Sequence, residues 1–217
     1  MKQLLFATII LSMALISCSK KNTPTPKQTI SMVTIAGKDY STIVIGNQTW
    51  TSVNYDGPGG ITDPNLDETV YGKFYTIAES EAITLPAGWR IPTQADFISL
   101  LKSQGVVQVT SGGRNELDSS ASHLRSISNW SKNGDNHSGF NAEPAGFGYA
   151  ANSSFLYQIG SAYYLSSTPY TARANSNAVL VIEGAFIAGG VIDDKAYIDP
   201  NEFLINPNLT LRFVKDN

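Results

Sequence analysis

The sequence predicts an α+β domain in which short helices pack on mixed or antiparallel sheets and long loops join the elements. Charged residues make up only 15% of the chain, while glycine, serine, threonine and asparagine are abundant. This composition is typical of loop-rich structures with short strands. Segments rich in β-branched residues lie near both ends of the chain, and a strongly marked helix start lies between them at residues 93–101.

The first 29 residues are predicted to lie outside this domain. Lys2 gives residues 1–17 a positively charged start, an apolar run too short for a comfortable membrane span follows, and Cys18 is the only cysteine. This order is similar to a bacterial lipoprotein signal, which is cleaved before a cysteine that then carries lipid. An ordinary secretory signal or a membrane anchor is the alternative. Residues 18–29 are polar and contain proline, which indicates a flexible tether, and residues 30–217 form the folded domain.

Charge and cysteine content limit the classes of function. The whole chain has a formal charge of -3, and removing the leader with Lys2 reduces its 15 basic residues to 14 against 18 acidic ones. Such a chain has no basic surface for nucleic acid, so no nucleic-acid partner is expected. Once Cys18 is lipidated, no thiol remains for a disulfide, a thiolate metal site or a cysteine nucleophile.

The N-terminal part of the domain is predicted to form two β-hairpins and then a helix. Three β-branched or aromatic segments alternate with glycine-containing turns. The segments are residues 30–35, 40–45 and 48–51, with turns at 37–38 and 46–47. A loop dense in Gly, Pro, Asp and Asn spans residues 55–68, and residues 71–83 have enough alanine, glutamate and aromatic residues for a helix of two or three turns.

Residues 85–101 contain the clearest local signals in the chain. Thr93 can cap a helix whose third residue, Asp96, completes a capping box, and Gly105 ends it. Trp89 lies between two prolines that keep the chain extended, so its indole is expected to enter a core. Three apolar residues share one helix face: Phe97, Leu100 and Leu101.

The C-terminal half is predicted to be loop followed by strands. A short helix over residues 119–126 would direct Leu124 and Ile127 inward, and residues 131–148 have no clear period. Alternating apolar residues predict strands in the last third. They cover residues 163–168, 178–183, 185–192 and 209–214, and the last one is expected to pair near the first strands of the chain.

Ordered landmarks along the chain resemble the Fibrobacter succinogenes major paralogous domain (FISUMP), found in exported proteins of Bacteroidetes-type bacteria. In the first half they are Ile45–Trp50 (IGNQTW), Tyr71–Tyr75 (YGKFY) and Pro86–Thr93 (PAGWRIPT). The order continues with His123–Ser126, Trp130, Asn133–Gly134, Gly139–Ala142, Pro144–Gly146, Tyr163–Thr168 and Leu211–Lys215. The resemblance covers most of residues 30–217.

The resemblance implies a C-type-lectin-like fold, which also houses the formylglycine-generating enzymes. That fold implies an α+β domain with two short helices, one sheet that joins both termini and long loops beside a small upper sheet, but activity does not come with the fold. The sugar-binding calcium motif of C-type lectins is absent, because Glu143-Pro144 continues into Ala145. The paired cysteines of the formylglycine-generating enzymes are absent as well, and residues 170–202 match the family pattern poorly.

Aromatic residues are the first candidates for a binding site. Trp50 and Trp89 stand beside strand or turn signals and are expected in a core. Trp130 is also expected in a core, but it adjoins a polar loop and could instead stack on a ligand. The tyrosines that could add exposed rings are Tyr149, Tyr157, Tyr163, Tyr164 and Tyr170. The candidate ligand-binding set is therefore Trp130, Asp135, Asn136 and Tyr164.

Neither a metal site nor a cofactor site is predicted. Asp63-x-Asn65-x-Asp67 imitates the start of an EF-hand, but Glu68 replaces the required glycine and Phe74 replaces the bidentate glutamate. Turn chemistry explains this loop, the similar residues 199–201 and the polar residues 135–137. Residues 146–151 spell a dinucleotide fingerprint without the strand and helix that would flank it.

These observations predict a non-catalytic, lipid-anchored binding or adhesion module of the cell envelope. No catalytic constellation is present, and His123 and His137 are the only histidines. Cys18 would attach the protein to the outer membrane, and the expected partner is a glycan or a surface protein. A subunit of a surface assembly and a glycan-active enzyme are the alternatives, since a glycosidase needs only two carboxylates. Binding is expected on residues 129–148 and 170–202.

Overall fold

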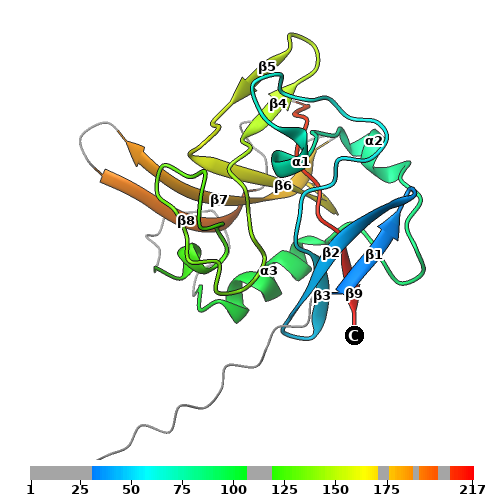
Figure 1. The fold of residues 1–217 in the computed structure, drawn as a ribbon, viewed down its shortest axis with the longest axis horizontal. Coiled ribbons are helices and arrows are strands. Elements are labelled where there is room, and N and C mark those ends of the chain that lie inside the picture. Colours follow the sequence, from blue (N-terminus) through cyan, green and yellow to red (C-terminus); the bar gives the residue numbers. More distant parts are fainter. Residues whose placement is uncertain (1–30, 107–118, 171–175, 188–190, 200–205) are drawn as a thin grey trace, which may run out of the picture.

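The computed structural model describes residues 31–106, 119–170, 176–187, 191–199 and 206–217. The fold is α+β: antiparallel sheets predominate and the helices are short (Figure 1). The predicted leader, Cys18 and the tether lie outside the described residues. None of the described helices is long and apolar enough to cross a membrane.

The first sheet joins the two ends of the described chain. Its strands are β1 (Ser31–Ile35), β2 (Lys38–Ile45), β3 (Gln48–Thr51) and β9 (Val214–Asp216), in the order β1-β2-β3-β9 and all antiparallel. Ala36 and Gly37 both have positive φ, as a two-residue hairpin turn requires, and Gly46 has positive φ in the second turn. The predicted hairpins are confirmed. Pairing of the C-terminal end with the first strands is also confirmed, but Val214–Asp216 makes it and not the predicted strand over 209–214.

The single helix predicted over residues 71–83 is wrong. Two short helices form instead, α1 (Glu68–Tyr71) and α2 (Ile77–Glu81), separated by Gly72, which has a φ of 74°. Phe74 and Tyr75 lie between them in β-bridges to Ile61 and Leu209. These bridges, to residues distant in sequence, override the local helix pattern, and a capping box of Thr76 and Glu79 then starts α2.

Helix α3 (Gln94–Ser103) confirms the prediction for this stretch. Thr93 and Asp96 form the capping box, Gly105 follows the helix with positive φ, and the three predicted apolar residues are buried. α3 contacts β6, β7 and β8 of the second sheet. Trp89 differs from the expectation: its indole is half-buried against the core, and Lys215 Nζ lies 5.8 Å from its ring centroid.

The predicted helix over residues 119–126 is only partly present. A 3-10 helix, η1 (Ser119–His123), occupies its first part and includes His123. Leu124 is buried as expected, but Ile127 is 69% exposed, so its predicted inward orientation is wrong. The chain leaves the helix after His123 because Ala142 N donates to Leu124 O at 2.8 Å and Ser126 N donates to Ala142 O at 2.9 Å.

The second sheet consists of β6 (Ser161–Pro169), β7 (Asn177–Ile187) and β8 (Val191–Asp199), in that order and antiparallel. The predicted break between residues 183 and 185 is wrong, since β7 continues through Gly184. Within residues 170–202, where two separate strands were predicted and binding loops were expected, β7 and β8 pair as one long hairpin. β4 (Phe147–Tyr149) and β5 (Ser154–Leu156) form a separate two-stranded sheet.

Residues 206–213 cross the interior of the molecule and do not form the predicted strand over 209–214. In Figure 1 this red segment runs from beside β4 through the centre to β9. Asn208, Leu209 and Thr210 make single bridges to three different segments. Both alternating sets of side chains are buried here, including Arg212. The segment lies between the two hydrophobic clusters of the core, so neither side faces water.

Candidate functional site

Both faces of the second sheet pack on the core: one on the cluster that contains α3, and the other, through Val179 and Val181, on the second cluster. Tyr164, Leu180 and Ile198 belong to the core cluster that contains α3. The register places Tyr163 opposite Val181 and Val181 opposite Tyr197, so these three side chains form a row on the other face. Glu183, opposite Ser161 and Lys195, belongs to the neighbouring row on that face. Two tyrosines and a carboxylate are thus brought together by strand alternation.

Three further aromatic rings extend this face toward β4 and β5. Tyr157 is 62% exposed, and its ring centroid lies 5.6 Å from that of Phe147 and 6.4 Å from that of Tyr163. Phe147 is buried and also contacts Tyr149 and Tyr163 edge-on, at 5.5 Å and 5.0 Å. We call Phe147, Tyr149, Tyr157 and Tyr163, together with Tyr197, the tyrosine face. Its buried phenylalanine supports the partly exposed tyrosines around it.

The turn that carries Tyr157 has an unfavourable backbone. Tyr157 has a φ of 61° and Ile159 a φ of 60°, a conformation that is rare for bulky and β-branched residues. Hydrogen bonds on both sides stabilise it: Ile159 N donates to Pro144 O at 2.9 Å, and Ser131 N donates to Ile159 O at 2.7 Å. The conformation turns Leu156, Tyr157 and Ile159 to solvent, where all three are exposed.

Electrostatics favour hydroxyl donors on the tyrosine face. Tyr197 donates to Glu183 Oε1 at 3.2 Å. Burial raises the pKa of Tyr163 and of Tyr197 well above the usual value, and the nearby Glu183 carboxylate adds to both shifts. Both phenols therefore stay protonated at neutral pH. The face offers flat apolar rings, phenolic hydroxyls and a carboxylate acceptor, which can bind a ligand with both apolar and hydroxyl-bearing surfaces.

The predicted ligand-binding residues do not share a surface. Tyr164 is 0% exposed, between Phe140 and the guanidinium of Arg212, and Trp130 is 6% exposed, with Nε1 donating to Ala142 O at 2.9 Å. Neither ring has an open face for a ligand, so both belong to the core. The core expectation for Trp130 is confirmed, as it is for Trp50.

Asp135 and Asn136 lie instead in a surface turn, as the sequence indicates. Asp135 Oδ1 accepts from His137 N at 2.9 Å, and Asn136 Oδ1 accepts from Asn141 N at 2.9 Å. Both side chains thus have roles within the turn, which explains the polar run over residues 135–137.

The acidic loop before α1 is also explained by its own hydrogen bonds. Asp63 is buried, and its carboxylate accepts from the backbone and side chain of Asn65 and from Gln158 Nε2 at 3.0 Å. Asp67 caps α1 by accepting from Thr69. Within the described ranges, no three His, Cys, Asp or Glu side chains are arranged as a metal centre. The second Asp-Pro-Asn run lies mostly outside those ranges.

Sequence reasoning named Tyr149, Tyr157 and Tyr163 as possible exposed rings but missed Tyr197 and Glu183. A signal for Tyr197 is present, because Lys195, Tyr197 and Asp199 alternate with Ala196 and Ile198, as in a half-buried strand. Glu183 has no comparable signal. Its place beside Tyr197 depends on the register of β7 and β8.

Comparison with known proteins identifies the family of the chain. A family described as the Fibrobacter succinogenes major domain matches residues 43–215. The chain belongs to this family. The Fibrobacter succinogenes major domain here spans the end of β2, all of β3, α3, the tyrosine face and all but the end of β9. No curated protein and no solved structure matches the chain.

Proposed function

We propose that the protein is a non-catalytic, lipid-anchored module of the cell envelope that binds a glycan on its tyrosine face. The observation that carries this proposal is the exposed ring of Tyr157, which packs against Phe147 and Tyr163. The positive φ of Tyr157, an energetically unfavourable backbone conformation, holds the ring at the surface. Conformations of this kind concentrate at ligand sites.

The chemistry of the tyrosine face suits a sugar. Pyranose rings present apolar C–H faces that pack on aromatic rings, while their hydroxyls need donors and acceptors. Glu183 supplies an acceptor and Tyr197 a hydroxyl within 3.2 Å of each other. The net charge of -3 disfavours a nucleic acid, whose bases also stack on tyrosines.

A subunit of a surface assembly is the second candidate. The exposed Leu156, Tyr157 and Ile159 follow one another closely in one turn, and contiguous exposed apolar residues also mark protein interfaces. A glycan-active enzyme is the third, and turnover of a polysaccharide by the purified protein would establish it in place of the non-catalytic function.

The first experiment is a glycan array with the full chain and the variants Tyr157→Ala and Tyr157→Phe. We expect Tyr157→Ala to weaken binding by roughly 3- to 10-fold, the value of one aromatic contact of about 0.5–1.5 kcal/mol. Tyr157→Phe keeps the ring and should bind almost like the parent. Ile127→Ala, which removes an exposed apolar side chain outside the tyrosine face, is the matched control.

Two results would contradict the proposal. One is the absence of binding to any glycan by a folded protein, which would favour the assembly. The other is glycan binding that Tyr157→Ala leaves unchanged while circular dichroism shows a native fold, which would place the ligand elsewhere.

We also propose that Cys18 carries the lipid anchor and holds the protein at the outer membrane. The leader and the only cysteine support this, and several acyl chains would anchor the protein firmly. Lys20 and Lys21, which follow Cys18, do not specify whether the protein lies on the inner or the outer face of the outer membrane. Cys18→Ala should abolish incorporation of labelled fatty acid and release the protein from the membrane fraction. Protease added to intact cells then distinguishes the two faces, and unchanged labelling of the variant would exclude Cys18.

The finer fold proposal is that the domain is C-type-lectin-like. The sheet that joins β1 and β9, and the separate sheet β6-β7-β8 beside long loops, support it. The test is superposition on a C-type lectin domain. Agreement of the strand order in both sheets is expected, whereas a different order would contradict the proposal.

A further inference from the structure

The only two histidines of the chain, His123 and His137, lie side by side although thirteen residues separate them in sequence. Backbone hydrogen bonds bring their segments together. Asp135 N donates to Ser122 O at 3.1 Å, and Ser138 N donates to His123 O at 3.0 Å. The two histidines are thus fixed by main-chain contacts on both sides of the pair, before any ligand binds.

Gly134 makes this close approach possible. A Cβ atom at this position would lie 2.4 Å from Ser122 O and 2.4 Å from Arg125 O, so no other residue fits without displacing the turn. Gly134 N also donates to Ser126 O at 2.8 Å. The turn that carries His137 therefore packs directly on the segment that carries His123.

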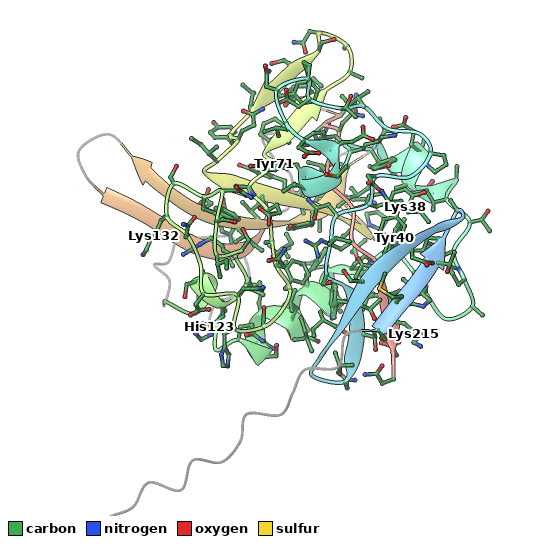
Figure 2. All side chains as sticks on the ribbon, viewed as in Figure 1. Lys38, Tyr40, Tyr71, His123, Lys132 and Lys215 are labelled. Atoms are coloured by element: carbon green, nitrogen blue, oxygen red, sulfur yellow. The ribbon has the colours of Figure 1, made fainter. Side chains whose placement is uncertain are left out.

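The two imidazoles are close and open to solvent. Their ring centroids are 5.1 Å apart with planes tilted by 48°, and the side chain of His123 is 37% exposed. Figure 2 shows His123 at the rim of the molecule. The carboxylate of Asp135 lies 3.6 Å from His123 Nε2 and is 54% exposed, which places negative charge beside the pair.

This spacing allows the two imidazoles to share one metal ion. A metal–nitrogen bond of about 2.0–2.1 Å places each ring centroid about 3.2 Å from the metal, so angles between square-planar and tetrahedral separate the centroids by about 4.5–5.2 Å. The observed 5.1 Å lies in this range. Calcium and magnesium ions do not suit this pair of histidines because both ions prefer oxygen ligands.

We propose that His123 and His137 bind one late divalent transition metal of the Cu2+, Ni2+ or Zn2+ class. The two imidazoles are the protein ligands, water completes the coordination shell, and Asp135 contributes its charge. A site with two protein ligands differs from a three-residue centre, which is not found in the described residues. It leaves open positions and suits reversible binding at the surface. It is independent of the tyrosine face.

Cu2+ is the probe of choice because it binds nitrogen sites most tightly among these ions. The full chain without a polyhistidine tag is titrated with Cu2+ by calorimetry, and electron paramagnetic resonance counts the bound nitrogens. We expect one equivalent bound through two imidazole nitrogens. His123→Ala and His137→Ala should each weaken binding by on the order of 10- to 100-fold, and the double variant should bind no more weakly than the weaker single one, because one imidazole gives no chelation.

Asp135→Asn should weaken Cu2+ binding by on the order of 10-fold, because it removes the neighbouring charge. Asp39→Asn, which removes a carboxylate in β2 on the first sheet, is the matched control and should bind like the parent. Strong one-equivalent binding that persists in the double histidine variant would overturn the proposal, as would a folded parent that binds no Cu2+ or a resonance spectrum with a single nitrogen.

Discussion

At the scale of single residues, Asp96 links three parts of the molecule. Its carboxylate accepts from Thr93 in the capping box, from Gln48 Nε2 of β3 at 2.6 Å and from the guanidinium of Arg90. Arg90 also contacts Asp216 of β9 at 3.0 Å. Burial alone would raise the pKa of Asp96, but the hydrogen bonds from Arg90, Thr93 and Gln48 outweigh it and lower this pKa to about 2.

A lowered pKa in the folded state has a definite effect on stability. The carboxylate of Asp96 stabilises the fold at pH values above its unfolded pKa, 3.8, and this contribution is lost as the pH falls toward about 2. We expect Asp96→Asn to lower the free energy of unfolding by about 1–3 kcal/mol at pH 7. Urea denaturation should show this difference shrinking between pH 4 and pH 2.

Glu81→Gln, on the exposed end of α2, is the control and should change stability by less than about 0.5 kcal/mol. A difference between Asp96→Asn and the parent that stays constant down to pH 2 would mean that the charge of Asp96 does not contribute.

At the scale of elements, α3 is stabilised by the face it buries. Phe97 and Leu101 are fully buried, and the ring of Phe97 stacks on Trp50 of β3 with centroids 5.7 Å apart. The helix thus packs between the first sheet and the strands β6, β7 and β8 that it contacts. Ten residues are too few for a stable isolated helix, so this packing determines whether α3 forms.

Leu101→Ala tests that packing. We expect it to lower the free energy of unfolding by about 2–5 kcal/mol, since it removes buried methyl groups and leaves a cavity. Urea denaturation at pH 7 measures the effect. Lys102→Ala, the next residue on the exposed side of the same helix, should cost less than about 0.5 kcal/mol, and equal losses in the two variants would show that the buried face is not decisive.

At the scale of the whole molecule, the last four residues close the fold. Val214 is fully buried and pairs with both Trp50 and Arg90, while Thr49 Oγ1 donates to Asn217 Oδ1 at 2.5 Å. The preceding residues contain Arg212, fully buried, which donates to Asn54 and to three backbone carbonyls of distant segments. The two ends of the domain therefore depend on each other.

Deleting residues 214–217 should abolish cooperative unfolding. The deletion removes β9, exposes Trp50 and leaves Arg90 without Asp216, losses that together are a large fraction of the ~5–15 kcal/mol by which most domains are stable. Thermal unfolding followed by circular dichroism measures it. Lys215→Ala, which removes only a partly exposed side chain over Trp89, should keep a sharp transition. A sharp transition in the deletion variant would contradict this dependence.

Local signals predicted the elements whose ends and periodicity are marked by neighbouring residues. The hairpin turns follow from their glycines, and α3 follows from its capping box and apolar stripe. The helix over residues 71–83 was wrong because Phe74 and Tyr75 bind Ile61 and Leu209, far along the chain. The inward orientation of Ile127 was wrong for the same reason, since the turn after Leu124 follows backbone bonds to Ala142.

The sequence by itself determined the α+β class, the family, the first hairpins and α3, because short-range periodicity, turn residues and caps are recorded in neighbouring positions. Only the tertiary structure decided which aromatic rings are buried and which polar groups meet. Tyr163 and Tyr164 are adjacent in sequence, yet strand alternation places one on the tyrosine face and one in the core. The proximity of Glu183 to Tyr197 and of His123 to His137 depends on strand register and on a close backbone contact at Gly134, neither of which any local pattern specifies.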